Sequence, residues 1–297
     1  MAISGRVTES SIHTRVLNNL QRNIQRGEKI QDQLSSGKQI NRPSDSPTGT
    51  VASMQLRAES RAAQQYSRNA DDGLGWLSTL DSTLSSTSDL LNQARDKTVQ
   101  GLNAGATSAE SREALAVEVD NIKATILGYA NTKYLDRPVF GGTTTGEVAY
   151  DKDGAFVGDT NTTARTVGAN SKVRVDATGP EAFGSGDTQV FAVLSSISDA
   201  LRSNDTDAMS TALTKLDSAS NSLKNTLSDV GARYNRITQM KQSAQDRLLS
   251  VTSQLSEVED VDLPKTIMEM QLQQTSYQAA LAASAKVIQP SLIDFLR

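Results

Sequence analysis

The chain of 297 residues contains no cysteine and a single histidine, His13. The absence of cysteine excludes disulfides, thiol catalysis and thiolate metal sites. A histidine-centred triad would have to use His13, near the start of the chain, where a solvated side chain is the simpler interpretation. The sequence also lacks a Walker loop, a G-x-G-x-x-G segment and an H-E-x-x-H pair. We therefore expect a protein that is not an enzyme and that has no cofactor, no catalytic residue and no metal.

Apolar residues are scarce as well, which limits the kind of core that the chain can bury. They make up 37% of the sequence, with only 4% aromatic residues, whereas an ordinary globular domain has roughly 45–50%. Such a composition favours long narrow seams over a thick round core. We expect an elongated, mainly α-helical rod.

Charge and hydropathy argue against two classes of partner. The net charge is −4, with both signs interspersed, so we expect no binding to nucleic acid. No stretch approaches the roughly 18 apolar residues of a membrane span, so we expect no membrane insertion. The first residues also lack the apolar core of a secretory signal peptide, which by itself indicates a cytoplasmic protein.

The first clear pattern is a seam of residues spaced by three and four, which predicts a helix. The seam is interrupted at Gly27 and Gln31. The helix should stop at Gly37, because glycine adopts the left-handed cap conformation that other residues avoid. The apolar members of the seam are Leu17, Leu20, Ile24 and Leu34.

A turn follows, with the sequence NRPSDSP at residues 41–47. Ser46 is well placed to cap a second helix, and Pro47 suits its first position because no amide partner is needed there. We expect this helix to run to about Gly101, with a kink at two glycines, Gly73 and Gly75. A third helix has regular spacing from Leu115 to Tyr129 and is expected to end at Arg137 and Pro138.

Residues 138–188 have a different composition, with 9 of the 19 glycines and little helical period. An Asp-Gly pair within residues 150–156 favours a hairpin turn, and residues 172–176 alternate like an exposed strand. We predict a small β-rich insertion on the outside of a helical body. A disordered loop is the alternative.

Helical periodicity returns at Gln189, and from Leu213 to Val258 it continues through fourteen positions. A helix of that length is on the order of 70 Å long. The pattern slips by one residue between Glu259 and Leu263, where Asp262 can cap a new helix. The last seam continues nearly to the end of the chain and includes Leu263, Ile267, Met270, Gln274, Tyr277, Leu281, Ser284, Ile288, Ser291 and Phe295.

These patterns divide the chain into five parts. We predict an N-terminal assembly segment (1–45), a first rod segment (46–137), the β-rich insertion (138–188), a returning rod segment (189–262) and a C-terminal assembly helix (263–297). An isolated amphipathic helix is marginal in water, so the two terminal helices should pair as a coiled coil. Their remaining apolar flank, repeated over many copies, would build a tube or filament. The residues expected to carry this contact are Leu17, Leu20, Ile24, Leu34, Ile267, Met270, Tyr277, Leu281, Ile288 and Phe295.

Three segments resemble one known family. Residues 33–47 (QLSSGKQINRPSDSP), residues 65–69 (QYSRN) and the final run 270–297 are similar to motifs of bacterial flagellins and hook-associated proteins. The resemblance covers roughly residues 1–140 and 190–297. It implies a structural flagellar subunit that assembles through its ends, with a signature turn made by Gly37, Pro43, Ser44, Asp45 and Pro47.

Within that family two roles compete, the filament subunit and the adaptor between hook and filament. The order Pro-Ser-Asp-x-Pro at residues 43–47, and the sequence YLDRPVFGGT at residues 134–143, resemble the adaptor more closely. Flagellins usually carry an Asn-Ser-Ala-Lys-Asp-Asp-like stretch where this chain has residues 41–45. We therefore expect the adaptor role, with the filament subunit as the alternative.

The resemblance also implies partners and a location. The partners would be copies of the chain, other hook-associated proteins, flagellin and an export chaperone. The location would be the extracellular flagellum, reached without a cleaved signal peptide. Three other classes remain open: a secretion-apparatus needle or tip protein, a cytoplasmic coiled-coil scaffold and, least favoured, a hydrolase in the insertion, which contains neither histidine nor cysteine.

Overall fold

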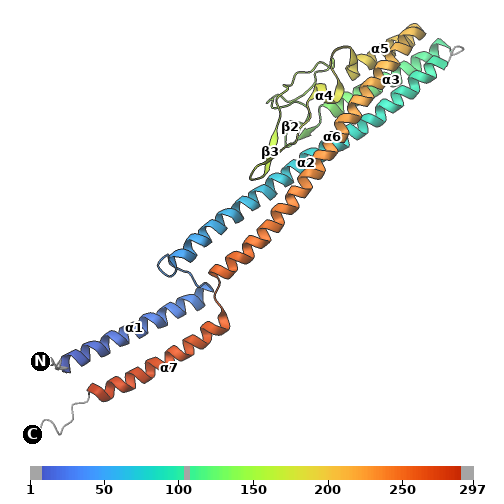
Figure 1. Ribbon diagram of the computed structural model, residues 1–297. Helices are drawn as coiled ribbons and strands as arrows, with labels where there is room; N and C mark the ends of the chain where they lie inside the picture. Colours follow the sequence, from blue (N-terminus) through green and yellow to red (C-terminus); the bar gives the residue numbers. More distant parts are fainter. Residues whose placement is uncertain (1–8, 104–107, 289–297) are drawn as a thin grey trace, which may run out of the picture. The chain divides into compact units, whose positions relative to one another are not determined.

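The computed structural model describes residues 9–103 and 108–288, and their side chains from 14 to 103 and from 108 to 285. Helices dominate and two short hairpins accompany them (Figure 1), so the predicted mainly α fold with a small β insertion is confirmed. The chain forms two compact units. Unit 1 combines Met1–Arg61 with Leu248–Arg297, and unit 2 is Ala62–Arg247.

Unit 1 contains the two terminal helices, α1 (Glu9–Ser36) and α7 (Leu263–Ile288), which lie side by side (Figure 1). The end of α1 follows the prediction, since Gly37 has a φ of +68°. Helix α2 (Pro47–Asn103) starts in this unit, and the Ser46 hydroxyl accepts a hydrogen bond of 3.1 Å from the Gly49 amide. The predicted caps at the end of α1 and at the start of α2 therefore form.

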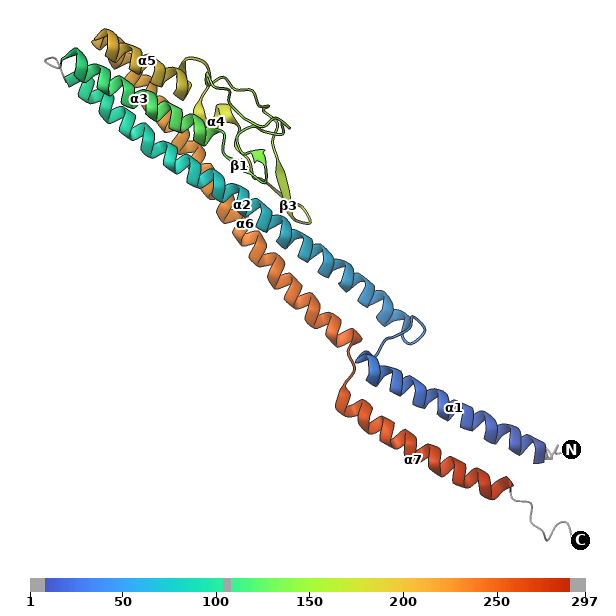
Figure 2. The same ribbon diagram turned by 180° about the vertical axis from the view of Figure 1, so that it is seen from behind.

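Unit 2 packs the long part of α2 against α3 (Ala109–Ala130), α5 (Val190–Ser203) and α6 (Thr206–Glu259), as both views show (Figures 1 and 2). Residues at intervals of seven along α6 are fully buried, so one stripe of the helix faces the core. An ion pair between Arg95 and Asp217, 2.8 Å long, links α2 to α6. The buried stripe of α6 in this unit is Leu216, Leu223, Val230 and Ile237.

Helix α3 ends earlier than predicted. It stops at Ala130, with Asn131 as its cap, and not at Arg137 and Pro138. Those two residues instead form strand β2 (Arg137–Pro138), which pairs antiparallel with β1 (Lys133–Tyr134). The Asn131 side chain ends the helix because it binds the backbone of the insertion: its oxygen accepts from the Ala149 and Tyr150 amides at 2.8 and 2.9 Å.

The insertion contains the hairpin β3 (Ala164–Gly168) and β4 (Ser171–Arg174), then α4 (Gly179–Phe183) and the 3-10 turn η1 (Gly186–Thr188). Its core is aromatic, although the whole chain has only five phenylalanines. Tyr150 is buried at the centre, with ring centres 5.4, 5.6 and 5.1 Å from those of Phe156, Phe183 and Phe191. Phe191 belongs to α5, so this cluster fastens the insertion to the helices of unit 2.

The two glycines of α2 do not interrupt the helix, which continues from residue 47 to residue 103. They allow other parts of unit 2 to approach it closely. A Cβ on Gly75 would overlap the Tyr134 hydroxyl, and one on Gly73 would lie 3.0 Å from Ile237 and 3.1 Å from Val175. Beside Gly75, the ring of Trp76 meets Tyr134 edge to face at 5.5 Å.

One helix boundary in the returning segment was not predicted. Helix α5 stops at Asn204, which has a left-handed backbone with a φ of +56°. Asp205 then caps α6, because its carboxylate accepts a 2.9 Å hydrogen bond from the Ala208 amide. Asparagine adopts the left-handed conformation more readily than most residues, so the local sequence explains the break.

Candidate assembly interface

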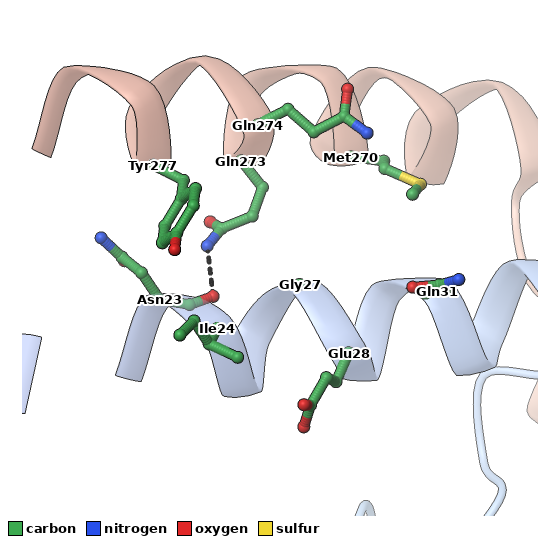
Figure 3. A pocket seen from close by; sticks show the side chains of 9 residues that line it. All are labelled: Asn23, Ile24, Gly27, Glu28, Gln31, Met270, Gln273, Gln274 and Tyr277. Carbon is green, nitrogen blue, oxygen red and sulfur yellow. Dashed lines mark hydrogen bonds between the residues drawn. The ribbon is translucent and has the colours of Figure 1, made fainter. Parts of the chain in front are cut away.

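Helices α1 and α7 run antiparallel, because the end of α1 and the start of α7 meet at the backbone hydrogen bond from Val261 to Gly37, 3.1 Å long. The pair is held farther along by the Gln273 side chain, which donates to the Asn23 carbonyl at 2.7 Å (Figure 3). Gly27 faces α7 next to this bond and leaves space between the helices. The predicted pairing of the two ends is therefore confirmed.

The residues predicted to carry the assembly contact fall into two groups. Leu20, Leu34, Met270 and Tyr277 are half-buried, and Met270 and Tyr277 line the space between the two helices. The others remain exposed although they are apolar: Leu17 (62% exposed), Ile24, Ile267 and Leu281. Ile288 is the last residue of α7 and its side chain lies outside the described ones, as does that of His13, while Phe295 lies outside the described residues altogether.

The exposed residues belong to a larger set, because most of the exposed large apolar side chains lie in unit 1. Ten of the fifteen large apolar side chains that are exposed in the described part of the structure belong to unit 1. Exposed apolar surface of this extent is a feature of interaction sites. The periodicity of the sequence missed three of these residues, since they lie off the predicted seams: Leu249, Met268 and Leu272.

Asp45 organises the signature turn. Its carboxylate accepts hydrogen bonds from the Arg42 and Asn41 amides at 2.9 and 3.3 Å and pairs with Lys29 of α1 at 3.2 Å. The hydrogen bond from the Arg42 amide, together with Lys29, lowers the pKa of Asp45. Pro43 and Ser44 project into solvent. The turn is thus held against α1 by one carboxylate.

A second carboxylate, that of Glu259, joins the connection between α1 and α2 to the connection between α6 and α7. Glu259, at the end of α6, is buried and pairs with Lys38 and Arg57 at 2.7 Å each. Beside it, the Gln39 amide donates to the Glu259 carbonyl at 2.6 Å, and Lys38 forms an isolated antiparallel bridge with Asp260. We call Lys38, Arg57 and Glu259 the linker clamp. No sequence motif predicted this cluster, because its three residues lie far apart in the chain.

The described residues lack two further kinds of site. Among them, no cluster of three or more histidine, cysteine, aspartate or glutamate side chains could hold a metal ion. Within the same residues, every helix is too short or too polar to cross a membrane. What distinguishes unit 1 is apolar surface on paired terminal helices.

Comparison with known families decides what this arrangement belongs to. The bacterial flagellin N-terminal helical region matches residues 8–145, and the bacterial flagellin C-terminal helical region matches residues 213–296. The matches therefore include both terminal helices, the signature turn and most of the long helices. The chain belongs to the bacterial flagellin family.

Individual members of the family are similar over most of their length. The flagellar hook-associated protein 3 of Escherichia coli is 28% identical over 280 residues, which cover 86% of this chain and 88% of that protein. The flagellin of Bacillus subtilis is 26% identical and covers 96% of both chains. A solved structure of a putative flagellar hook-associated protein from Vibrio parahaemolyticus shares the fold, with a TM-score of 0.67 at 20% identity over 73% of this chain and all of that one.

Proposed function

We propose that the chain is a structural, non-enzymatic subunit of the bacterial flagellum that joins hook to filament. The observation that supports this most strongly is the exposed apolar surface of unit 1, on the helices that the flagellin family has in common. Burying such surface between subunits provides ~25 cal/mol per Å². The contact residues would be the exposed ones, Leu17, Ile24, Ile267 and Leu281, together with Ile288 and Phe295.

Two observations favour the adaptor over the filament subunit. The E. coli relative is named flagellar hook-associated protein 3, and the sequence YLDRPVFGGT at residues 134–143 resembles the adaptor more closely than the filament subunit. The B. subtilis flagellin is matched over 96% of its length, which keeps the filament subunit as the second candidate. In either role, the partners would be copies of this chain, hook-associated proteins and flagellin, after export with a chaperone and without a cleaved signal peptide.

Electron microscopy of cells that lack the chain separates the two candidates. An adaptor predicts hooks that carry no filament, with flagellin released into the medium. A filament subunit predicts hooks without filaments and no flagellin from this gene in the medium. Hooks with normal filaments would contradict both.

A substitution at Leu281 tests the proposed surface itself. Because the Leu281 side chain is exposed, Leu281→Asp leaves the α1–α7 pair intact and places a charge where subunits would meet. We expect loss of filament attachment with unchanged helicity of the purified chain. Val117→Asp is the matched control, since Val117 is equally exposed but lies in unit 2. Normal filaments on cells with Leu281→Asp would refute this surface.

A further inference from the structure

The packing of side chains between α1 and α7 fixes their register only weakly, where register means which residues of the two helices lie opposite each other. Among the described side chains of the two helices, only that of Thr266 is buried. The apolar seam is also interrupted, at Gly27 and Gln31 in α1 and at Gln274 in α7. Because such a seam repeats every seven residues, moving α1 by seven residues would bring a similar set of side chains together.

The connections to the terminal helices differ in length. Three residues, 260–262, join α6 to α7, whereas ten residues, 37–46, join α1 to α2. Ten residues span roughly 33 Å when extended, and a movement of α1 by seven residues along its axis requires roughly 10 Å. The connection to α2 would therefore allow α1 to move along α7 unless something else holds it.

The linker clamp holds α1 directly after its last residue. The Lys38 ammonium lies 2.7 Å from the Glu259 carboxylate, which is also held from α2. Next to this ion pair, the Gln39 amide donates to the Glu259 carbonyl at 2.6 Å, and the Val261 amide donates to the Gly37 carbonyl at 3.1 Å. Hydrogen bonds require a close distance and a favourable angle, so all these contacts break when α1 moves by one turn.

A hydrogen bond farther along the pair specifies the same register. The Gln273 side chain donates to the Asn23 carbonyl at 2.7 Å (Figure 3). Asn23 precedes Gly37 by 14 residues (37 − 23), and Gln273 follows Val261 by 12 residues (273 − 261). At 1.5 Å per residue these separations are roughly 21 and 18 Å. The clamp and this bond therefore agree on one alignment of the helices.

We propose that the linker clamp sets the register of the α1–α7 pair. The inference concerns a single copy of the chain and does not depend on its role in the flagellum. It has a consequence for the surface of unit 1, because the exposed apolar side chains come from both helices: Leu17 and Ile24 from α1, Ile267 and Leu281 from α7. Their arrangement on the outside of the pair depends on where α1 lies along α7.

The signature turn is the competing anchor, since Asp45 pairs with Lys29 of α1. The Lys29 side chain is 50% exposed, whereas that of Glu259 in the clamp is 3% exposed. Ion pairs with exposed partners contribute little to stability. The buried clamp is therefore the anchor that the structure favours.

Disulfide formation in the purified full-length chain measures the register, and the natural chain has no cysteine that would interfere. Gly27→Cys/Gln273→Cys is the native pair, because a Cβ on Gly27 lies 3.9 Å from Cγ of Gln273. Its second substitution also removes the bond to Asn23 and leaves the clamp to act alone. Gly27→Cys/Ala280→Cys, combined with Gln273→Ala for the same purpose, is the shifted pair. Its cysteines lie roughly 10 Å apart along the axis in the native register, beyond the ~7 Å between Cα atoms that a disulfide allows.

The clamp is then broken by Lys38→Asp, which places a second carboxylate against Glu259. Disulfides within one chain are quantified by mass spectrometry after mild oxidation of a dilute sample. With the clamp intact, we expect a disulfide in the native pair and none in the shifted pair. With Lys38→Asp, the native disulfide should decrease roughly tenfold, which corresponds to the loss of one charged hydrogen bond, and the shifted disulfide should form. Glu259→Gln should change both yields in the same directions, and Lys29→Asp, which breaks the competing ion pair, should change neither.

Four results would overturn the proposal. The first is a native pair that forms no disulfide while the clamp is intact. The second is an unchanged yield from both pairs in Lys38→Asp and in Glu259→Gln. The third is a loss of the native disulfide without a gain of the shifted one in both variants, which would mean that the clamp holds the helices together and does not align them. The fourth is a change of register in Lys29→Asp, which would assign the register to the signature turn.

Discussion

The Lys38 ammonium lies 2.7 Å from the carboxylate of Glu259, although 221 residues separate them in the chain. The Glu259 side chain is only 3% exposed, and Arg57 contacts the same carboxylate from α2. Burying a carboxylate is costly unless it is paired and hydrogen-bonded. The linker clamp therefore ties the α1–α2 connection to the α6–α7 connection, which is where the terminal helix pair begins.

Replacing Glu259 by Gln should loosen this junction. The amide keeps the shape of the carboxylate but not its charge, and a hydrogen bond to a charged group contributes about 1.5–3 kcal/mol. We expect the Gln39 and Val261 amides, which bond across the junction, to exchange with solvent deuterium at least tenfold faster. Glu257→Gln is the control, because Glu257 is an exposed carboxylate two residues away. Equal exchange in the two variants would show that the clamp contributes nothing.

The effect of the clamp should depend on pH in one direction. Hydrogen bonds from Arg57 and Lys38 lower the pKa of Glu259 from 4.5 to about 2. A carboxylate whose pKa is lower in the folded state stabilises that state fully above its unfolded pKa. The contribution is lost as the pH falls from 4.5 through 2.

The measurement compares the unaltered chain with Glu259→Gln at several pH values. The difference in exchange rate at the Gln39 and Val261 amides, each corrected for intrinsic exchange, should be constant above pH 5 and should shrink toward pH 2. A difference that stays the same at pH 2 would mean that the Glu259 charge is not its cause.

Much of the helical layout followed from local sequence. Gly37, Ser46 and Asp262 act on their immediate neighbours, so the helix ends that they set could be predicted: the Asp262 carboxylate accepts a hydrogen bond from the Lys265 amide at 3.2 Å. Heptad spacing along α6 likewise predicted most of the buried stripe, including Leu216, Leu223, Val230 and Ile237, whereas Tyr234 of the same predicted seam is exposed.

What could not be predicted depends on distant partners. The end of α3 is determined by Asn131, whose side chain binds Ala149 and Tyr150, and no local signal marks that contact. The exposure of Met268 and Leu272 was missed for a related reason: a seam search selects one face of a helix, whereas α7 is apolar on more than one. For the same reason the predicted contact residues differ in burial: Leu20 and Tyr277 are half-buried, while Leu17 is exposed.

Gly75 should not tolerate a side chain, although helices usually gain from losing a glycine. In an open helical site, Gly→Ala stabilises by about 1 kcal/mol. At Gly75 the new methyl group would displace Tyr134 from its contact with Trp76, and such overpacking costs about 1–3 kcal/mol. We expect Gly75→Ala to lower the free energy of unfolding in urea.

Gly231→Ala is the matched control for this experiment. Gly231 lies in α6, and a Cβ there would have no neighbour within 4 Å. This variant should be more stable than the unaltered chain. If both variants were more stable than the unaltered chain, the packing of Tyr134 against Trp76 would not depend on the absence of a side chain at Gly75.

Leu135 has a left-handed backbone conformation, which asparagine adopts more readily than leucine. The two-residue turn between β1 and β2 has positive φ at both positions, +48° at Leu135 and +62° at Asp136, as a type I′ turn requires. The left-handed region costs an ordinary residue about 1–2 kcal/mol, and asparagine less. Leu135→Asn should therefore raise the free energy of unfolding by about 1 kcal/mol. Because Leu135 is 73% exposed, the substitution removes little packing. Leu135→Ala keeps the unfavourable φ and should bring no gain. If alanine stabilised as much as asparagine, the gain would come from removing exposed apolar surface and not from relief of the turn.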